Sequence, residues 1–340
     1  MIKKVLLFST IVLTILVFTT ACDNKEEKDY DYLVLVNKYS QLPDDWEDTV
    51  KLVDAKNAWD EDIKVEKEAY EQYKKLAKVL KDEGITIELD SVYRSVKEQQ
   101  KLWDDWSKDP EKGLDYVKKY VAVPGYSEHH TGLAIDICLR KGKKLVYEND
   151  DMIADRKTFK KIHDKLADYG FILRYLEGRD DITGYAYEPW HLRYVGSKKI
   201  AKEITDKNIT FEEYLERIED VKGTPSAAKY RIEKTLQEYF KDAYGDEITN
   251  SRFNVKKIYS KEDEKNDKTI KSLKLGDKDI AFEVEYQLQP AEGADVNKLT
   301  IPDGEFDETL GWVKNIGRVG VLKYNKKDNS YSIDNFGTGW

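Results

Sequence analysis

The sequence predicts an α+β protein: a small, mainly antiparallel sheet with packed helices, followed by a second α+β domain at the C-terminus. Two observations underlie this prediction. The chain has 340 residues, a length typical of about two domains, and helical and strand periods alternate along it. Its composition, 40% hydrophobic and 36% charged, suits globular domains. The net charge of −9 argues against nucleic acid as a partner, because a protein that binds phosphates needs a basic face.

The first residues have the pattern of a secretory signal. A basic start precedes an apolar run over residues 5–18, and small residues follow up to Cys22. This arrangement resembles the lipobox of bacterial lipoproteins, in which the cysteine is acylated. It predicts a signal peptide over residues 1–21, lipidation of Cys22 and a polar linker over residues 22–30. The protein would then be held at the extracellular face of the cytoplasmic membrane; an uncleaved anchor helix is the alternative.

Residues 31–221 are predicted to form the first domain. Apolar residues recur at helical spacing over residues 65–81, and a strand-like alternation follows over residues 85–89. A capping-box pattern that begins at Ser95 places Arg94 directly before a helix. The remaining elements expected here are a helix that ends at Gly170, strands over residues 171–175 and 191–195, and a helix capped by Thr210 with Glu213.

Residues 222–340 are predicted to form the second domain. A helix over residues 227–244 precedes alternating strands, of which residues 280–288 have the clearest pattern. No cluster of histidine or cysteine and no glycine-rich loop occurs in this part of the sequence. The chemistry is therefore expected in the first domain.

Three polar residues of the first domain suggest a metal site. A catalytic zinc ion needs about three protein ligands, usually histidine with aspartate or glutamate. Asp136 lies in an apolar run, where an unpaired carboxylate is costly to bury and a cation would remove the cost. The predicted zinc ligands are therefore His129, Asp136 and His191, with a turn permitted at Gly132 between the first two. The alternative for Asp136 is a pair with an arginine or exposure on an edge strand.

Glu188 is the predicted general base. It stands three residues before His191 and next to Pro189, whose ring favours an extended backbone at the preceding residue. A carboxylate there can take a proton from an attacking water whose acidity zinc increases; taken alone, it would be a surface carboxylate. Cys138 lies in the same apolar run as Asp136 and is expected to be buried, without a disulfide partner.

Three segments resemble the VanY-type D-alanyl-D-alanine carboxypeptidases, zinc peptidases of bacterial cell-wall metabolism that share a fold with D-Ala-D-Ala dipeptidases and the hedgehog signalling domain. The segments are "SVYRS", "PGYSEHHTGLAIDI" and "FILRYLEGRDDITGYAYEPWHLRYVG", and the likeness runs over residues 33–196. The resemblance implies zinc on His129, Asp136 and His191, with Glu188 as the base.

The resemblance further implies that Arg94 polarises the scissile carbonyl or holds the substrate's carboxylate, with Gln99 and Ser127 lining the pocket. A guanidinium suits either task, because its fork of donors matches a carboxylate or a developing oxyanion. His130 stands where similar proteins more often have glutamine, and we expect it at the pocket rim or behind the ligands. His163 is expected to be structural.

The function that the resemblance implies is removal of the terminal D-alanine from peptidoglycan stem peptides by a membrane-tethered zinc carboxypeptidase. An L,D-carboxypeptidase acting on tetrapeptide stems uses the same chemistry and is one alternative. A non-catalytic wall-binding lipoprotein is the other, although the presence of the base and all three ligands favours an enzyme. For residues 222–340, binding of a wall polymer or a protein partner is the remaining expectation.

Overall fold

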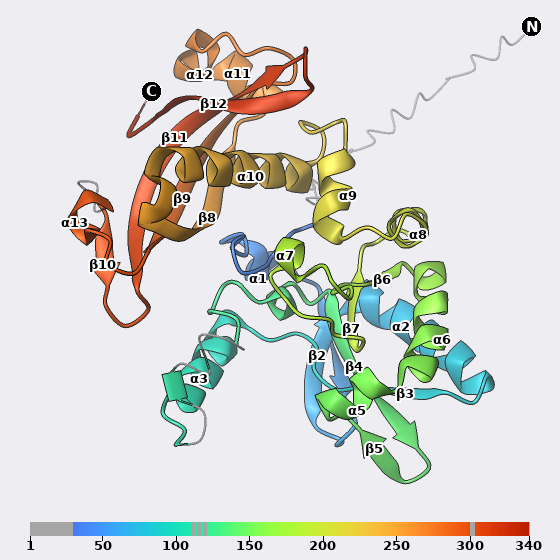
Figure 1. Cartoon of the computed structure of the whole chain (residues 1–340). Coiled ribbons are helices and arrows are strands. Elements are labelled where there is room, and N and C mark those ends of the chain that lie inside the picture. The colour runs from blue at the N-terminus through green and yellow to red at the C-terminus, as the bar shows by residue number, and fades with distance from the viewer. Residues whose placement is uncertain (1–29, 111–112, 115–116, 118–120, 300–302, 340) are drawn as a thin grey trace, which may run out of the picture. The chain divides into compact units, whose positions relative to one another are not determined.

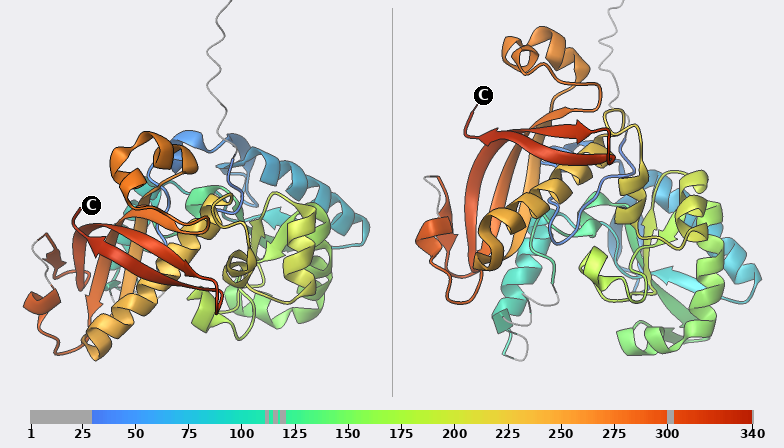
Figure 2. Two further views of the ribbon diagram at one scale, coloured as in Figure 1. Left: turned by 90° about the horizontal axis from the view of Figure 1, so that it is seen from above. Right: turned by 45° about the horizontal axis from the view of Figure 1, so that its top comes forward.

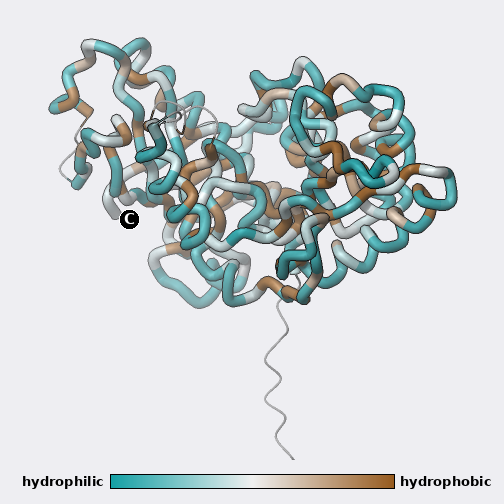
Figure 3. Tube along the Cα trace, turned by 90° about the horizontal axis from the view of Figure 1, so that it is seen from below, coloured by the Kyte–Doolittle hydropathy of each residue, from teal (hydrophilic) through white to brown (hydrophobic). Residues whose placement is uncertain are grey.

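The computed structural model describes residues 30–110, 113–114, 117, 121–299 and 303–339. The predicted signal peptide and Cys22 lie outside these residues, as does all of the linker except Tyr30. From Asp31 onward the chain forms one compact unit. Apolar and hydrophilic stretches alternate along its trace (Figure 3), and no described helix is both long and apolar enough to cross a membrane.

The first sheet has five strands and only antiparallel pairs, as the sequence predicts. Their order is β3-β4-β7-β6, and β5 pairs with β4 (Figure 1). The strands are β3 (Thr86–Leu89), β4 (Ala134–Lys141), β5 (Lys144–Val146), β6 (Phe171–Leu173) and β7 (His191–Tyr194). Cys138 on β4 is buried, as expected. The α+β class predicted for this part is confirmed.

Helices pack around this sheet, and two of them begin at the capping residues that the sequence predicts. Ser95 and Thr210 each form a capping box with the glutamate three residues on, and Gly170, with φ of 77°, ends the helical segment before β6. The helices of this part are α1 (Trp46–Thr49), α2 (Lys67–Asp82), α3 (Val96–Ser107), α5 (Asn149–Ala154), α6 (Arg156–Leu166), α7 (Asp180–Thr183), α8 (Lys198–Asp206) and α9 (Phe211–Arg217), with the 3-10 turns η1 (Glu128–Thr131) and η2 (Ala167–Tyr169).

One predicted helix begins two residues later than expected. The helix expected over residues 65–81 begins at Lys67, because Val65 and Glu66 end a strand. That strand, β2 (Asp62–Glu66), forms an antiparallel hairpin with β1 (Leu52–Lys56), which the sequence analysis did not predict. The carboxylate of Glu66 accepts a hydrogen bond of 2.7 Å from the backbone N–H of Ala69 and so caps α2.

The C-terminal part is a helix packed on a second antiparallel sheet, as predicted. The order is β10-β11-β9-β8, with β12 beside β11, and α10 lies along one face of the sheet (Figures 1 and 2). The elements are α10 (Pro225–Tyr244), η3 (Gly245–Glu247), β8 (Ile248–Ile258), α11 (Lys261–Asn266), α12 (Lys268–Ser272), β9 (Ile280–Pro290), α13 (Val296–Leu299), β10 (Glu305–Asp307), β11 (Trp312–Asn325) and β12 (Ser330–Gly337).

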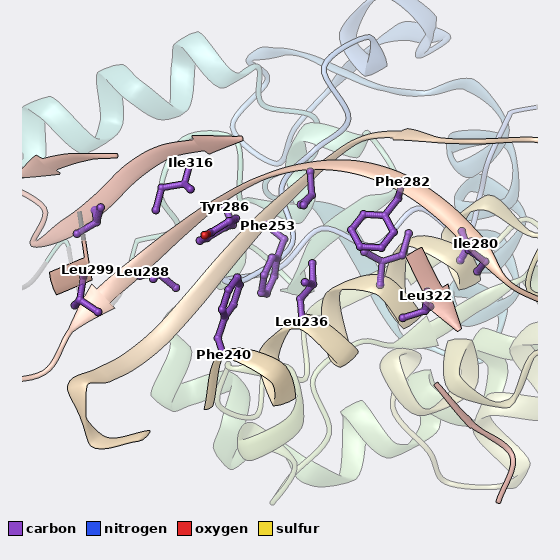
Figure 4. Packing of buried hydrophobic residues seen from close by; sticks show 14 of the residues in the cluster. Leu236, Phe240, Phe253, Ile280, Phe282, Tyr286, Leu288, Leu299, Ile316 and Leu322 are labelled. Atoms are coloured by element: carbon purple, nitrogen blue, oxygen red, sulfur yellow. The ribbon is translucent and has the colours of Figure 1, made fainter. Parts of the chain in front are cut away.

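The core of this part forms between α10 and the sheet. Leu236 and Phe240 of α10 face Phe253 and Tyr286 of the strands (Figure 4), and all four are at most 2% exposed. The face of β9 predicted from its alternation is buried in this cluster, and its residues are Ile280, Phe282, Val284, Tyr286 and Leu288.

A short segment near residue 40 connects the first part of the chain to β8 of the C-terminal sheet. Phe253 of β8 donates its N–H to the carbonyl of Tyr39 at 2.8 Å, and its own carbonyl accepts from Gln41 at 3.0 Å. Asp44 pairs with Lys256 at 2.7 Å. The predicted domain boundary between residues 221 and 222 stays a prediction.

Candidate metal centre

Two strands and a 3-10 turn bring the three predicted ligands together. Asp136 on β4 and His191 on β7 are direct partners in the antiparallel register, so their side chains lie on the same face. His129 reaches the same place from η1. Gly132 ends η1 in the left-handed region, with φ of 72°, and turns the chain into β4 as expected. The ligand atoms of the three side chains all lie within 4.8 Å of one another.

The carboxylate of Asp136 lies between the two imidazoles. Its Oδ2 is 3.1 Å from Nε2 of His129, and its Oδ1 is 2.9 Å from Nδ1 of His191. Despite this closeness, the buried Oδ1 has no hydrogen-bond partner among the described residues. A buried acceptor that faces a ring nitrogen without a hydrogen bond is costly, and a shared cation would satisfy it.

The outer nitrogen of each ligand histidine fixes the tautomer. Nδ1 of His129 lies 2.7 Å from the carbonyl oxygen of Val92, and Nε2 of His191 lies 2.9 Å from the carboxylate of Glu128. Both partners can only accept, so these two nitrogens must donate. In the neutral imidazoles the lone pairs then remain on Nε2 of His129 and Nδ1 of His191, which are the nitrogens that face Asp136. Histidine ligands of metals are commonly held in this way.

The charges around the cluster favour a cation. Burial acts to lower the pKa of His191, but the carboxylates of Asp136 and Glu128 outweigh it and raise the pKa to about 10. Burial acts to raise the pKa of Asp136, and the two imidazoles outweigh it and hold the pKa below its ordinary range. Zinc binds nitrogen and oxygen ligands of these types at about 2.0–2.2 Å and keeps an open position for water. The donor set fits zinc.

Glu188 lies beside the cluster. Its Oε2 is 3.8 Å from Nδ1 of His191, and 28% of its side chain is exposed. Burial raises the pKa of Glu188 to about 7, with His191 acting in the opposite direction. A carboxyl group with such a pKa can take up and release a proton near neutral pH. His163 donates from Nε2 to the carbonyl of Pro189 at 2.9 Å, which fits the structural role expected of it.

Arg94 approaches the cluster from the segment before α3. Its Nη1 donates to Oε1 of Gln99 at 2.8 Å, its Nη2 donates to Oγ of Ser91 at 3.0 Å, and its backbone N–H donates to the carbonyl of His129. Gln99 is buried and holds the guanidinium from behind. Two of the five guanidinium N–H groups are thus used, and the others are available to a substrate. Ser127 is buried directly before η1 but does not cap it.

His130 lies behind Arg94 and is not a ligand. It is fully buried, not at the rim of a pocket. Its Nδ1 donates to the carbonyl of Arg94 at 2.6 Å, and its Nε2 accepts from the backbone N–H of Gly125 at 3.1 Å. Burial lowers its pKa to about 4, so the neutral ring is favoured. His130 therefore ties the loop at Gly125 to the backbone of Arg94.

A buried ionic network behind His191 was missed from the sequence. Oε1 of Glu128 accepts from Nε of Arg174 and from Nη1 of Arg193, both at 2.8 Å. Burial acts to raise the pKa of Glu128, but the two guanidinium groups outweigh it and hold the pKa far below its ordinary value. Glu128 stays charged and fixes His191. The available signal was an arginine directly after one apolar strand, another within a second strand, and a glutamate inside the histidine motif.

The region of the chain that carries this site is similar to known proteins. The family model described as "D-alanyl-D-alanine carboxypeptidase" (VanY) matches residues 62–197. The chain is 40% identical over 193 residues to the putative carboxypeptidase YodJ of Bacillus subtilis, covering 56% of this chain and 68% of that protein. It is 42% identical over 159 residues to the bifunctional D-Ala-D-Ala dipeptidase and carboxypeptidase VanXYC of Enterococcus gallinarum, covering 46% and 79%.

A solved structure of the LD-carboxypeptidase LdcB is also similar, with 39% identity, a TM-score of 0.49, and coverage of 55% of this chain and 87% of that one. The residues that the family model matches include the metal cluster and the predicted base. On the strength of these relatives, the chain belongs to the VanY family of D-alanyl-D-alanine carboxypeptidases.

Proposed function

We propose that this protein is a zinc-dependent D-alanyl-D-alanine carboxypeptidase that removes the terminal D-alanine from peptidoglycan stem peptides. The observation that supports the proposal most is the cluster of His129, Asp136 and His191, with ligand atoms within 4.8 Å of one another and Glu188 beside it. A relative with 42% identity is named as a D-Ala-D-Ala dipeptidase and carboxypeptidase, which supports this substrate.

Each residue near the cluster has a defined part in the reaction. A zinc ion held by the three ligands would polarise the scissile carbonyl and make a water molecule more acidic. Glu188 accepts the proton of that water as it attacks the carbonyl carbon, and then donates a proton to the departing amine. Arg94 directs its remaining N–H groups to the terminal carboxylate or the developing oxyanion. The C–N bond breaks, giving free D-alanine and a peptide one residue shorter.

The test supplies the zinc-loaded protein with pentapeptide and tetrapeptide stems and identifies the products by mass spectrometry. Loss of one alanine from the pentapeptide supports the proposal, whereas loss from the tetrapeptide alone would indicate an L,D-carboxypeptidase. Glu188→Gln is the matched control, because it keeps the ligands but removes the base. If the protein binds one zinc ion per chain but shows no hydrolysis that depends on the metal, a non-catalytic wall-binding protein is favoured.

We further propose that lipidation of Cys22 holds the enzyme at the outer face of the cytoplasmic membrane. The support is the apolar run over residues 5–18 and the small residues before Cys22. Cys22→Ser is expected to prevent acylation and processing at this position, which the mass of the mature protein reports. If the Cys22→Ser protein and the wild type have the same mass apart from the substituted residue, the uncleaved anchor is favoured.

A further inference from the structure

Two cationic side chains without a counter-ion lie near the candidate metal centre. Lys38 belongs to the segment before α1, and Arg252 belongs to β8 of the C-terminal sheet. Within the part of the chain that the structure describes, neither side chain forms an ion pair, and the ammonium of Lys38 makes no hydrogen bond. Both are half-buried. A partly desolvated cation is usually paired, so this pair needs an explanation.

Aromatic rings hold the two cations in place. Nε of Arg252 donates to the backbone carbonyl of Lys38 at 3.0 Å. Nζ of Lys38 lies 4.7 Å from the ring centroid of Tyr185, and the guanidinium of Arg252 lies 4.0 Å from that of Trp312 and 5.1 Å from that of Tyr126. Cation–π contacts of this kind position a charge without neutralising it.

The pair is connected to the metal centre through two further ring contacts. The rings of Tyr185 and Tyr175 lie 4.8 Å apart, and the ring of Tyr175 lies 4.7 Å from the imidazole of His191. Burial and the nearby guanidinium of Arg252 lower the pKa of Lys38, while the candidate base acts in the opposite direction. Lys38 is thus close enough to both the base and Arg252 to sense their charges.

The two cations lie close enough for Arg252 to lower the pKa of Lys38, and an anion between them would relieve this repulsion. A carboxylate that reached both groups would accept charge-assisted hydrogen bonds from the ammonium and from the free N–H groups of the guanidinium. In a carboxypeptidase only the last residue of the substrate lies beyond the scissile bond. That residue has a single carboxylate, for which Arg94 is the predicted partner unless it binds the oxyanion, so a carboxylate at Lys38 and Arg252 is expected to come from the residues that precede the bond.

We propose that Lys38 and Arg252 form a binding site for a carboxylate that precedes the scissile bond of the peptide substrate. The C-terminal sheet thereby takes a direct part in substrate selection, since it supplies Arg252 and the Trp312 ring beneath it. This inference rests on the proposed function, because the peptide at the metal centre is what brings the carboxylate to the site.

The test uses peptides that end in D-Ala-D-Ala and carry a carboxylate at each of the three preceding positions in turn, each matched with its amide. Binding is measured by calorimetry on the zinc-loaded Glu188→Gln protein, so that no turnover interferes. At one position the acid is expected to bind about tenfold or more tightly than the amide, as the loss of a charge-assisted hydrogen bond predicts.

Lys38→Gln, combined with Glu188→Gln, is expected to bring the ratio of affinities for the acid and the amide peptides close to one. The change breaks none of the hydrogen bonds that join β8 to the segment at residue 40. Arg252→Gln should have the same effect. Lys314→Gln removes a positive charge from β11 that is already paired with Asp307, and should leave the ratio unchanged. Melting curves check that each variant is folded.

A ratio near one at all three positions in the protein with Lys38 and Arg252 intact would overturn the inference, as would a ratio that neither substitution changes. Release of D-alanine by the wild-type enzyme is measured separately. Its absence would count against the proposed function, whereas the binding ratio alone decides on the carboxylate site.

Discussion

Glu128→Ala is expected to lower both the stability of the fold and the affinity for zinc. The side chain is 1% exposed and accepts hydrogen bonds from Arg174, Arg193 and His191 at 2.8–2.9 Å. After the change, Arg174 keeps its bonds to Glu212, but both buried arginines lose a carboxylate. Breaking a buried ion pair by removing one partner costs about 3–5 kcal/mol, a large share of the roughly 5–15 kcal/mol that stabilises a typical domain.

The same change affects the metal centre through His191. Without the acceptor at Nε2, the imidazole is no longer held in the tautomer that presents the lone pair of Nδ1 to the metal. Loss of such a supporting contact lowers metal affinity by about 10–100-fold. Glu128→Gln keeps the shape and one acceptor oxygen but not the charge, so a smaller loss of stability, about 1–3 kcal/mol, is expected for it.

Urea unfolding of the metal-free proteins measures the stability, and competition with a chromophoric chelator measures the zinc affinity. Glu177→Gln is the control, because Glu177 pairs with Arg156 at the surface with both side chains 60% exposed, and such exposed pairs contribute little to stability. The reasoning is refuted if Glu128→Ala unfolds within about 1 kcal/mol of the wild type, or if it binds zinc as tightly.

Three further changes test other parts of the site. Gly132→Ala should lower the free energy of unfolding by about 1–3 kcal/mol, since φ is 72° and an added Cβ would lie 3.2 Å from the Cβ of Glu66. Gly84→Ala is the control, because Gly84 has φ of 82° but open space around it. It should lower the free energy of unfolding by less in the same urea assay. Burial lowers the pKa of His130 to about 4, so between about pH 6.5 and 4 the unfolded chain binds a proton that the folded chain does not. As the pH is lowered through this range, the free energy of unfolding should fall by up to about 1.4 kcal/mol per pH unit. His130→Gln should reduce this dependence on pH in unfolding curves. Glu188→Gln should lower kcat by roughly 10²–10⁴-fold while metal analysis finds unchanged zinc; activity near that of the wild type would exclude Glu188 as the base.

The residues of the metal cluster could be proposed from the sequence because their chemistry is unusual for their surroundings. An aspartate inside an apolar strand demands a partner, and histidines are few in this chain. The structure adds what spacing alone could not supply, namely the register in which Asp136 faces His191 across two strands. Register depends on the pairing of whole strands, and only the antiparallel arrangement brings these two residues opposite each other.

The buried network behind the cluster could not be predicted in the same way. Glu128, Arg174 and Arg193 each look like surface residues when taken singly, and their burial is tolerable only because all three are present together. The hairpin over residues 52–66 was missed for a simpler reason. Its strands carry mostly exposed or half-buried residues, so they show little of the alternation that marks a half-buried strand.

The pairing of residues 39–41 with β8 gives the C-terminal sheet a route to the metal motif. Leu42, the next residue, donates its N–H to the carbonyl of Gly125 at 2.8 Å. The N–H of Gly125 in turn donates to His130, whose other nitrogen donates to the carbonyl of Arg94. The segments along this route are joined by direct hydrogen bonds, and His130 is fully buried, so a shift of the β8 edge is expected to displace either these bonds or the backbone of Arg94. The C-terminal part therefore supports the predicted substrate-binding arginine through this chain of contacts, in addition to supplying Arg252, which bonds to the backbone of Lys38.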